Sequence, residues 1–169
     1  MRTGDAAMED VGARRLPAGS YWFEDLQAGD WFETGRMTVT EAHIVAFAGL
    51  SGDFFDVHMD DEFAREQGFP GRIAHGLLGL ALTDGLKNRA EARMMAIASL
   101  GWNWRFVTPI VAGDRIGARI RVTETRLSRK GQGIVTLHLE VTQQEGRVVQ
   151  QGETTLMVRK RPEAGTSGG

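Results

Sequence analysis

The stretch "RIAHGLLGLALTDGLKNRAEARM", residues 72 to 94, decides the fold. From Gly76 to Leu86, apolar residues occupy nearly every face of the helix that their spacing predicts, and a helix of that kind is surrounded by protein. Gly76, Gly79 and Gly85 each disfavour a helix by roughly 1 kcal/mol relative to alanine. Three glycines that each destabilise the helix predict that a sheet or a ligand approaches the helix backbone closely.

Long strands follow this helix. The segment "RIGARIRVTE" (115–124) alternates apolar and polar residues, as does "VTLHLEVTQQ" (135–144), which is typical of antiparallel strands with one buried face. Glu145–Gly146 predicts a hairpin turn. Further strands are expected over 96–110 and 147–160.

Shorter elements precede the helix. The segment "WFETGRMTV" (31–39) predicts a strand, and "TEAHIVAFAGLSG" (40–52) predicts a helix with Thr40 as its N-cap. A second short helix is expected in "DDEFAREQGF" (60–69). The order of elements predicts an α+β fold, an antiparallel sheet wrapped around a long central helix.

The length of 169 residues suits one domain. Residues 1–20 and 161–169 lack periodicity and are expected to be flexible tails around a folded domain at 21–160. The net charge of −2 gives no basic excess, so no nucleic-acid partner is expected. No apolar run has the length of a signal peptide or a membrane span, so a cytoplasmic protein without a membrane partner is expected.

The residues best suited to catalysis are concentrated in "SGDFFDVHMDDEFA", residues 51–64. Asp53 and His58 would lie about 140° apart on a helix, so only a loop can bring them together. Phe55 and Val57 between them would then form a dry wall beside an acid–imidazole pair. The spacing alone leaves an alternative open, in which Asp53 is a cap and His58 is either exposed or satisfied in the core.

His75 and Gly76 open the long helix. A helix N-terminus offers free N–H groups and a partial positive charge, and a glycine lets a ligand reach them. Such a site suits the oxyanion of a polarised thioester carbonyl. A tight turn into a packed helix is the alternative.

Three features in order resemble the MaoC-like acyl dehydratases, the (R)-specific enoyl-CoA hydratases of hotdog fold. They are Asp53-x4-His58 with an acid two residues later, the His75–Gly76 helix start, and Pro-x-x-x-Gly-Asp at 109–114 before a long strand. The resemblance covers about residues 20 to 160. It implies an acyl-CoA hydratase or dehydratase, with coenzyme A as part of the substrate and no other cofactor. It also implies a homodimer or a higher homo-oligomer. The four histidines are scattered without paired-ligand spacing, so no metal is expected.

The resemblance further implies that Asp53 and His58 form the acid/base pair and that the Gly76 N–H polarises the thioester carbonyl. Phe55, Val57, His75 and Asp84 would contact the substrate. The sequence departs from the family where Phe55 and Asp56 replace the usual Asn and Pro. Asp84 stands where a small hydroxyl residue is usual, and its pairing with Lys87 or Arg89 is an equal alternative.

Candidates for binding the coenzyme A phosphates are Lys87 and Arg105, with Arg89 and Lys130 as further possibilities. Two other functions stay open on the sequence. A hotdog thioesterase would use a carboxylate near the central helix without the Asp53–His58 pair, and a non-catalytic hotdog would only bind acyl-CoA.

Overall fold

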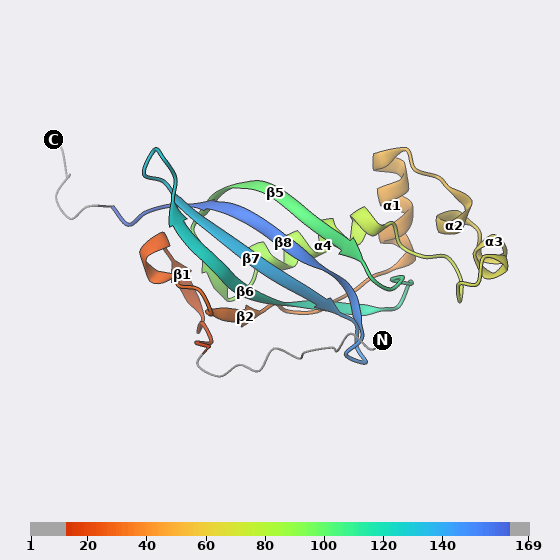
Figure 1. Ribbon diagram of the computed structural model, residues 1–169. Helices are drawn as coiled ribbons and strands as arrows, with labels where there is room; N and C mark the ends of the chain where they lie inside the picture. Colours follow the sequence, from red (N-terminus) through yellow and green to blue (C-terminus); the bar gives the residue numbers. More distant parts are fainter. Residues whose placement is uncertain (1–12, 163–169) are drawn as a thin grey trace, which may run out of the picture.

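A computed structural model describes residues 13–162. It confirms the α+β prediction, because a curved antiparallel sheet wraps around one long helix (Figure 1). In chain order the elements are β1 (Gly19–Tyr21), η1 (Phe23–Asp25), β2 (Trp31–Glu33), β3 (Met37–Thr38), α1 (Glu41–Ser51), α2 (Asp56–Met59), α3 (Asp61–Glu66), α4 (Gly76–Asn88), β4 (Ala92–Met94), β5 (Ala96–Phe106), β6 (Arg115–Leu127), β7 (Gly133–Thr142) and β8 (Val148–Val158).

The main sheet has the strand order β2-β6-β7-β8-β5, and β3 also pairs with β6. Neighbouring strands in it are antiparallel, whereas the short strands β1 and β4 form a separate parallel pair. The hairpin between β7 and β8 turns at Gly146, as expected, with a φ of 82°. The strand β5 lies at one edge of the sheet.

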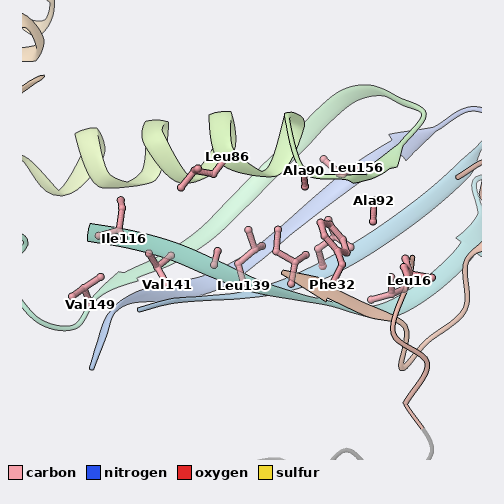
Figure 2. Packing of buried hydrophobic residues seen from close by; sticks show 14 of the residues in the cluster. Leu16, Phe32, Leu86, Ala90, Ala92, Ile116, Leu139, Val141, Val149 and Leu156 are labelled. Atoms are coloured by element: carbon pink, nitrogen blue, oxygen red, sulfur yellow. The ribbon is translucent and has the colours of Figure 1, made fainter. Parts of the chain in front are cut away.

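The core lies between α4 and the concave face of the sheet. Leu86 extends from α4 toward Ile116, Leu139 and Val141 on the strands (Figure 2). Each of these side chains is at most 2% exposed. The alternation along β6 and β7 therefore turns one apolar face toward the helix and leaves the polar face outside.

Two of the three glycines of α4 meet the sheet closely, as the sequence predicts. A Cβ on Gly76 would lie 2.8 Å from the ring of Phe106 on β5, and a Cβ on Gly79 would overlap the side-chain amide of Gln150 on β8. Gly85 differs, because nothing lies within 4 Å of the place where its Cβ would be. The expectation of close approach is wrong there.

The amide of Gln150 connects helix and sheet. It accepts a hydrogen bond from Trp104 Nε1 (3.0 Å) and donates one from Nε2 to the carbonyl of Gly76 (3.0 Å). Gln150 is only 2% exposed. A buried amide with both ends bonded holds the first turn of α4 at a fixed distance from β8.

The expectation that α4 is surrounded by protein is wrong for part of its surface in this single chain. Leu77 is 61% exposed, while Leu78 and Leu86 on the opposite side are buried. The sheet covers only one side of the helix. The apolar outer side of α4 therefore stays accessible at its N-terminal end.

The predicted N-terminal tail also needs correction at its boundary. Leu16 is 4% exposed, and Arg14 pairs at 2.6 Å with Asp30, whose carboxylate is fully buried. A buried carboxylate requires such a partner, so residues 13–20 belong to the folded unit. Residues 1–12 and 163–169, also assigned to tails, lie outside the described residues.

We expect Gly79→Ala to lower the free energy of unfolding by about 1–3 kcal/mol, since its methyl group would displace a buried and bonded amide. Gly85→Ala is the matched control on the same helix. It should raise stability by about 0.5–1 kcal/mol, because space is open there and alanine favours the helix. Urea denaturation of both variants measures the difference. Equal effects of the two substitutions would contradict the close contact at Gly79.

Candidate active site

Asp53 is placed by the end of α1. Thr40 caps the start of this helix, as predicted, and accepts a hydrogen bond from the His43 N–H. Gly52 ends it with a φ of 79°, a left-handed conformation that favours glycine. The chain therefore turns directly before Asp53, whose Oδ1 accepts a hydrogen bond from the Phe55 N–H (3.3 Å).

His58 lies on the one-turn helix α2, which the sequence analysis expected to be loop. Asp53 precedes that helix. The two residues therefore do not lie on one continuous helix, in agreement with the expectation that a helix could not bring them together. Carboxylate and imidazole atoms of Asp53, His58 and His75 all lie within 4.8 Å of one another. The structure thus brings Asp53 and His58 together, as predicted.

The orientation of His58 is fixed by the backbone. Its Nδ1 lies 2.8 Å from the carbonyl oxygen of Ile73. A carbonyl only accepts, so Nδ1 carries the proton and Nε2 keeps a lone pair in the neutral ring. The Ile73 carbonyl therefore fixes the tautomer of His58, and no side-chain pattern can reveal the role of a backbone group.

His75 differs from its predicted role as a substrate contact. It is 3% exposed and lies between Phe47 and His58, with ring centroids 5.0 Å and 3.8 Å away. Its Nε2 donates to the backbone carbonyl of Asp53 (2.9 Å). The side chain therefore contacts protein on several sides.

Gly76 begins α4, and the N–H of a first helical residue has no partner within the helix. A cavity of about 250 Å³ lies beside it, with mostly apolar lining that includes Ile73, Phe106 and Ile110. A larger hollow of about 550 Å³ lies between Arg14, Glu24 and Arg161. We place the site at the smaller cavity, because the acid–imidazole pair adjoins it through Ile73 and the larger hollow is lined by none of these groups.

Asp53, His58 and His75 are the described residues closest to a metal-binding arrangement. The bond from His58 Nδ1 to a carbonyl also occurs in metal sites, where Nε2 binds the ion. However, His75 uses Nε2 for the Asp53 carbonyl, and its ring is stacked on His58 rather than converging with it. The arrangement fits proton transfer better than coordination of one ion by all three.

The aromatic wall is only partly formed. Val57 is buried, but Phe54 and Phe55 are each 58% exposed. The ring of Phe55 meets His58 edge-on at 6.5 Å and Phe63 at 5.9 Å. Phe55 therefore covers one edge of the imidazole, and its other side is open in the single chain.

Asp84 and Lys87 pair with each other, and contact between Asp84 and a substrate stays a prediction. The Lys87 Nζ lies 2.6 Å from Asp84 Oδ1 and 5.3 Å from the centre of the Trp102 ring. The Lys87 side chain is 6% exposed. Its prediction as a phosphate ligand does not fit this burial, and the alternative that Asp84 pairs with Lys87 is confirmed.

Arg105 is exposed on β5. Its neighbours Trp104 and Phe106 face α4, so Arg105 faces the outer side of the sheet. Arg89 approaches Met37 Sδ at 3.3 Å, and Lys130 lies in the turn after β6. Binding of coenzyme A phosphates by these residues stays a prediction.

One set of contacts that supports the site, made by Arg72, was not predicted from the sequence. Arg72 donates its backbone N–H to Asp61 Oδ1 (2.8 Å), and its side chain pairs with Glu41 (3.1 Å). The backbone hydrogen bond from Arg72 lowers the pKa of the Asp61 carboxyl. These contacts tie α1 and α3 to the segment that carries Ile73, His75 and Gly76.

Comparison with known proteins identifies the family. The profile of the MaoC like domain matches residues 26–144. Protein MaoC of Klebsiella aerogenes is 43% identical over 112 residues, which cover 66% of this chain and 32% of that protein. An (R)-specific enoyl-CoA hydratase of Rhodospirillum rubrum is 31% identical over 141 residues, 83% of this chain and 94% of that one.

Solved structures agree. A MaoC-like dehydratase from Rhodospirillum rubrum matches with a TM-score of 0.76 and 31% identity, covering 84% of this chain and 99% of that one. A Mycobacterium tuberculosis protein with a double hotdog fold gives a TM-score of 0.75 at 21% identity, over 88% of this chain and 47% of that one, which shows the fold alone.

The α+β architecture is therefore a hotdog fold. The chain belongs to the MaoC-like domain family, a family of hydratases and dehydratases, and the prediction of a hydro-lyase is confirmed at that level. The chain spans about a third of the length of the Klebsiella protein. Among residues 13–162, no helix is long and apolar enough to cross a membrane.

We expect the Asp61 anchor to make stability depend on acid. A carboxyl with a lowered folded-state pKa stabilises the fold fully above its usual value of about 3.9, and this contribution is lost as the pH falls through the lowered pKa. The variant Asp61→Asn should therefore be less stable than the parent at pH 6, and the difference should shrink below pH ~4. Urea denaturation at several pH values measures it, with Glu66→Gln as the control on the same helix. A difference that grows toward acid would contradict the anchor.

Proposed function

We propose that this protein adds water reversibly to a 2-enoyl-CoA and forms a (3R)-hydroxyacyl-CoA. The observation that carries the proposal is the arrangement of His58. Its Nδ1–H is bound by the Ile73 carbonyl, its Nε2 is left to accept a proton, and the Asp53 carboxylate lies beside it. The relative named (R)-specific enoyl-CoA hydratase, which this chain matches over 94% of that protein's length, supports the substrate class.

The reaction assigns a task to each group. His58 and Asp53 hold a water molecule and take one of its protons as its oxygen bonds to the β-carbon. The electron pair of the double bond moves toward the thioester, and the Gly76 N–H stabilises the negative charge on its oxygen. His58 and Asp53 then return the proton to the α-carbon. Dehydration is the same path in reverse.

The partial positive charge at the N-terminus of α4 favours this assignment. The negative charge of the enolate-like transition state would develop beside the first turn of the helix, where it is stabilised most. The apolar cavity beside Gly76 would take part of the acyl-CoA and exclude water from the thioester. No metal or separate cofactor takes part in this scheme, since the chain supplies both the proton carriers and the oxyanion donor.

We also propose that the protein is at least a homodimer joined along β5. Among residues 13–162, this edge strand pairs in the main sheet with β8 alone, and its exposed apolar residues include Ile97 (55%) and Leu100 (51%). An unpaired edge with apolar side chains favours pairing with a second chain. The exposed residues Phe55 and Leu77 near the site would also gain cover if the interface extends there.

We expect Asp53→Asn and His58→Ala each to lower kcat for crotonyl-CoA hydration by about 10²–10⁴-fold, as usual for general acid–base groups. The double variant should be little worse than either single one, because the two residues act as a unit. Loss of the enoyl absorbance measures hydration, and a thiol reagent measures free coenzyme A.

The control is His43→Ala, which changes a half-buried histidine in the first turn of α1 outside the Asp53–His58–His75 group and should keep its activity. Release of free coenzyme A without loss of the enoyl group would instead support the thioesterase alternative. Activity near that of the parent in either single variant would remove Asp53 and His58 from the mechanism.

The dimer has its own test. Light scattering should give at least twice the chain mass of 18.6 kDa. Leu100→Lys should weaken the association, because a charge would enter the apolar edge. Leu127→Lys, at the far end of β6 with similar exposure (53%), should not. A parent protein that stays monomeric at all concentrations would contradict the proposal.

A further inference from the structure

We propose that His75 is a positioning residue, which fixes both members of the Asp53–His58 pair through two different atoms of one ring. This inference rests on the proposed function. It replaces the predicted role of His75 in contacting substrate, since the side chain is 97% buried and is enclosed by protein groups.

The first constraint acts on Asp53. The Nε2 of His75 lies 2.9 Å from the Asp53 backbone oxygen, which can only accept, so Nε2 carries the proton. This bond joins positions 22 residues apart. It adds to two local bonds within two residues of Asp53: the Asp53 N–H donates to Ser51 Oγ, and Asp53 Oδ1 accepts from the Phe55 N–H. Among these three bonds, it alone ties the Asp53 loop to the start of α4.

The second constraint acts on His58. The hydrogen bond from Nδ1 to Ile73 fixes one end of the ring but leaves it free to turn about that bond. The ring of His75 stacks on the face of His58 at 3.8 Å with 27° between the planes. Stacking restricts that rotation, so the direction of the His58 Nε2 lone pair is set.

Phe47 completes the support. Its ring lies 5.0 Å from the His75 ring at an angle of 53°, and it comes from α1, the helix that ends at Asp53. His75 is thus placed between a ring of α1 and the imidazole of α2. A shift of either helix would move His75 and with it the groups that it holds.

Packing alone does not account for a histidine here. The Nδ1 atom of His75 is buried and has no hydrogen-bond partner among the described residues. A buried acceptor without a donor costs stability, and a phenylalanine would fill similar space without that cost. The donor function of Nε2 is the feature that a phenylalanine lacks.

The position of His75 also links the pair to the oxyanion donor. The peptide between His75 and Gly76 carries the N–H assigned to the thioester oxygen. The same residue therefore sets the distance between the acid–base groups and the oxyanion site. Small displacements at such a point affect the chemical step more than binding.

Two variants separate the two constraints. His75→Phe keeps an aromatic ring against His58 and removes the donor to Asp53. His75→Gln keeps a donor at nearly the same distance from the backbone and removes the ring. The matched control is His138→Phe on β7, the same substitution on a strand remote from the site.

We expect His75→Phe to lower kcat for crotonyl-CoA by roughly 10–100-fold with little change in KM, as misplacement of catalytic groups does. His75→Gln should recover part of that loss. His138→Phe should keep the activity of the parent. Melting temperatures show whether each variant is folded.

A double-variant cycle with Asp53→Asn decides the role. If His75 acts through Asp53 and His58, then His75→Phe should lower the activity of Asp53→Asn by no more than about threefold, since the parts of one unit are not additive. If the two losses multiply, His75 is only structural and this inference is wrong. Full activity of His75→Phe would overturn it as well.

Failure of the inference is distinguishable from failure of the proposed function. If Asp53→Asn and His58→Ala alone leave hydration intact, the acid–base assignment falls, and His75 has no pair to position. If both abolish hydration and His75→Phe does not, only the inference falls. Should His75→Phe not fold, the cycle of His75→Gln with Asp53→Asn tests the constraint on His58 instead, because this variant removes the stacked ring: its loss should be no more than about threefold in the Asp53→Asn background, and losses that multiply would overturn the inference.

Discussion

The contact between the first two turns of α4 and the sheet determines where the candidate site lies. Gly76 and Gly79 let the helix backbone reach the Phe106 ring and the Gln150 amide, and Gln150 holds the Gly76 carbonyl. Any side chain at these positions would push the helix away from the sheet. The N-terminus of α4 is therefore fixed to β5 and β8 with little freedom, and the chain that leads into it is fixed as well.

That leading segment, Ile73–Gly76, supplies almost every support of the site. It lies between α2 and the 110–111 segment, with hydrogen bonds from the Ile73 N–H to Val57 and from the Ala74 N–H to Ile110. The Ile73 carbonyl orients His58, and the His75 side chain donates to the carbonyl of Asp53. The last N–H of the segment, that of Gly76, belongs to the start of α4. Acid, base and oxyanion donor are thus set against one short stretch of backbone. This construction explains how a residue pair on a short loop and a one-turn helix can be held in one geometry.

Residue patterns predicted the parts of the fold that depend on local chemistry. The alternation in β6 and β7, the Thr40 cap and the apolar run of α4 all follow from periodicity, and the order of Asp53, His58 and Gly76 pointed to the site. The errors have physical reasons. Gly85 shows that a helical glycine need not meet a neighbour, and Lys87 shows that a cation can be buried by an ion pair and an aromatic ring. The role of the Ile73 carbonyl could not be predicted from the sequence, because every residue has a backbone carbonyl. Gln150 is a polar residue at a buried strand position, which is only a weak sign of a special role. That role becomes clear only when Gly79 is known to lie opposite it.

The most direct test of this account is a crystal structure of the protein with a bound 3-hydroxyacyl-CoA. The account predicts that the thioester oxygen accepts a hydrogen bond from the Gly76 N–H at about 2.7–3.1 Å. It also predicts that the 3-hydroxyl group lies between the Asp53 carboxylate and His58 Nε2, with the Ile73 and His75 hydrogen bonds unchanged. A thioester bound away from the start of α4, or a hydroxyl group in contact with neither Asp53 nor His58, would contradict the proposed hydratase site.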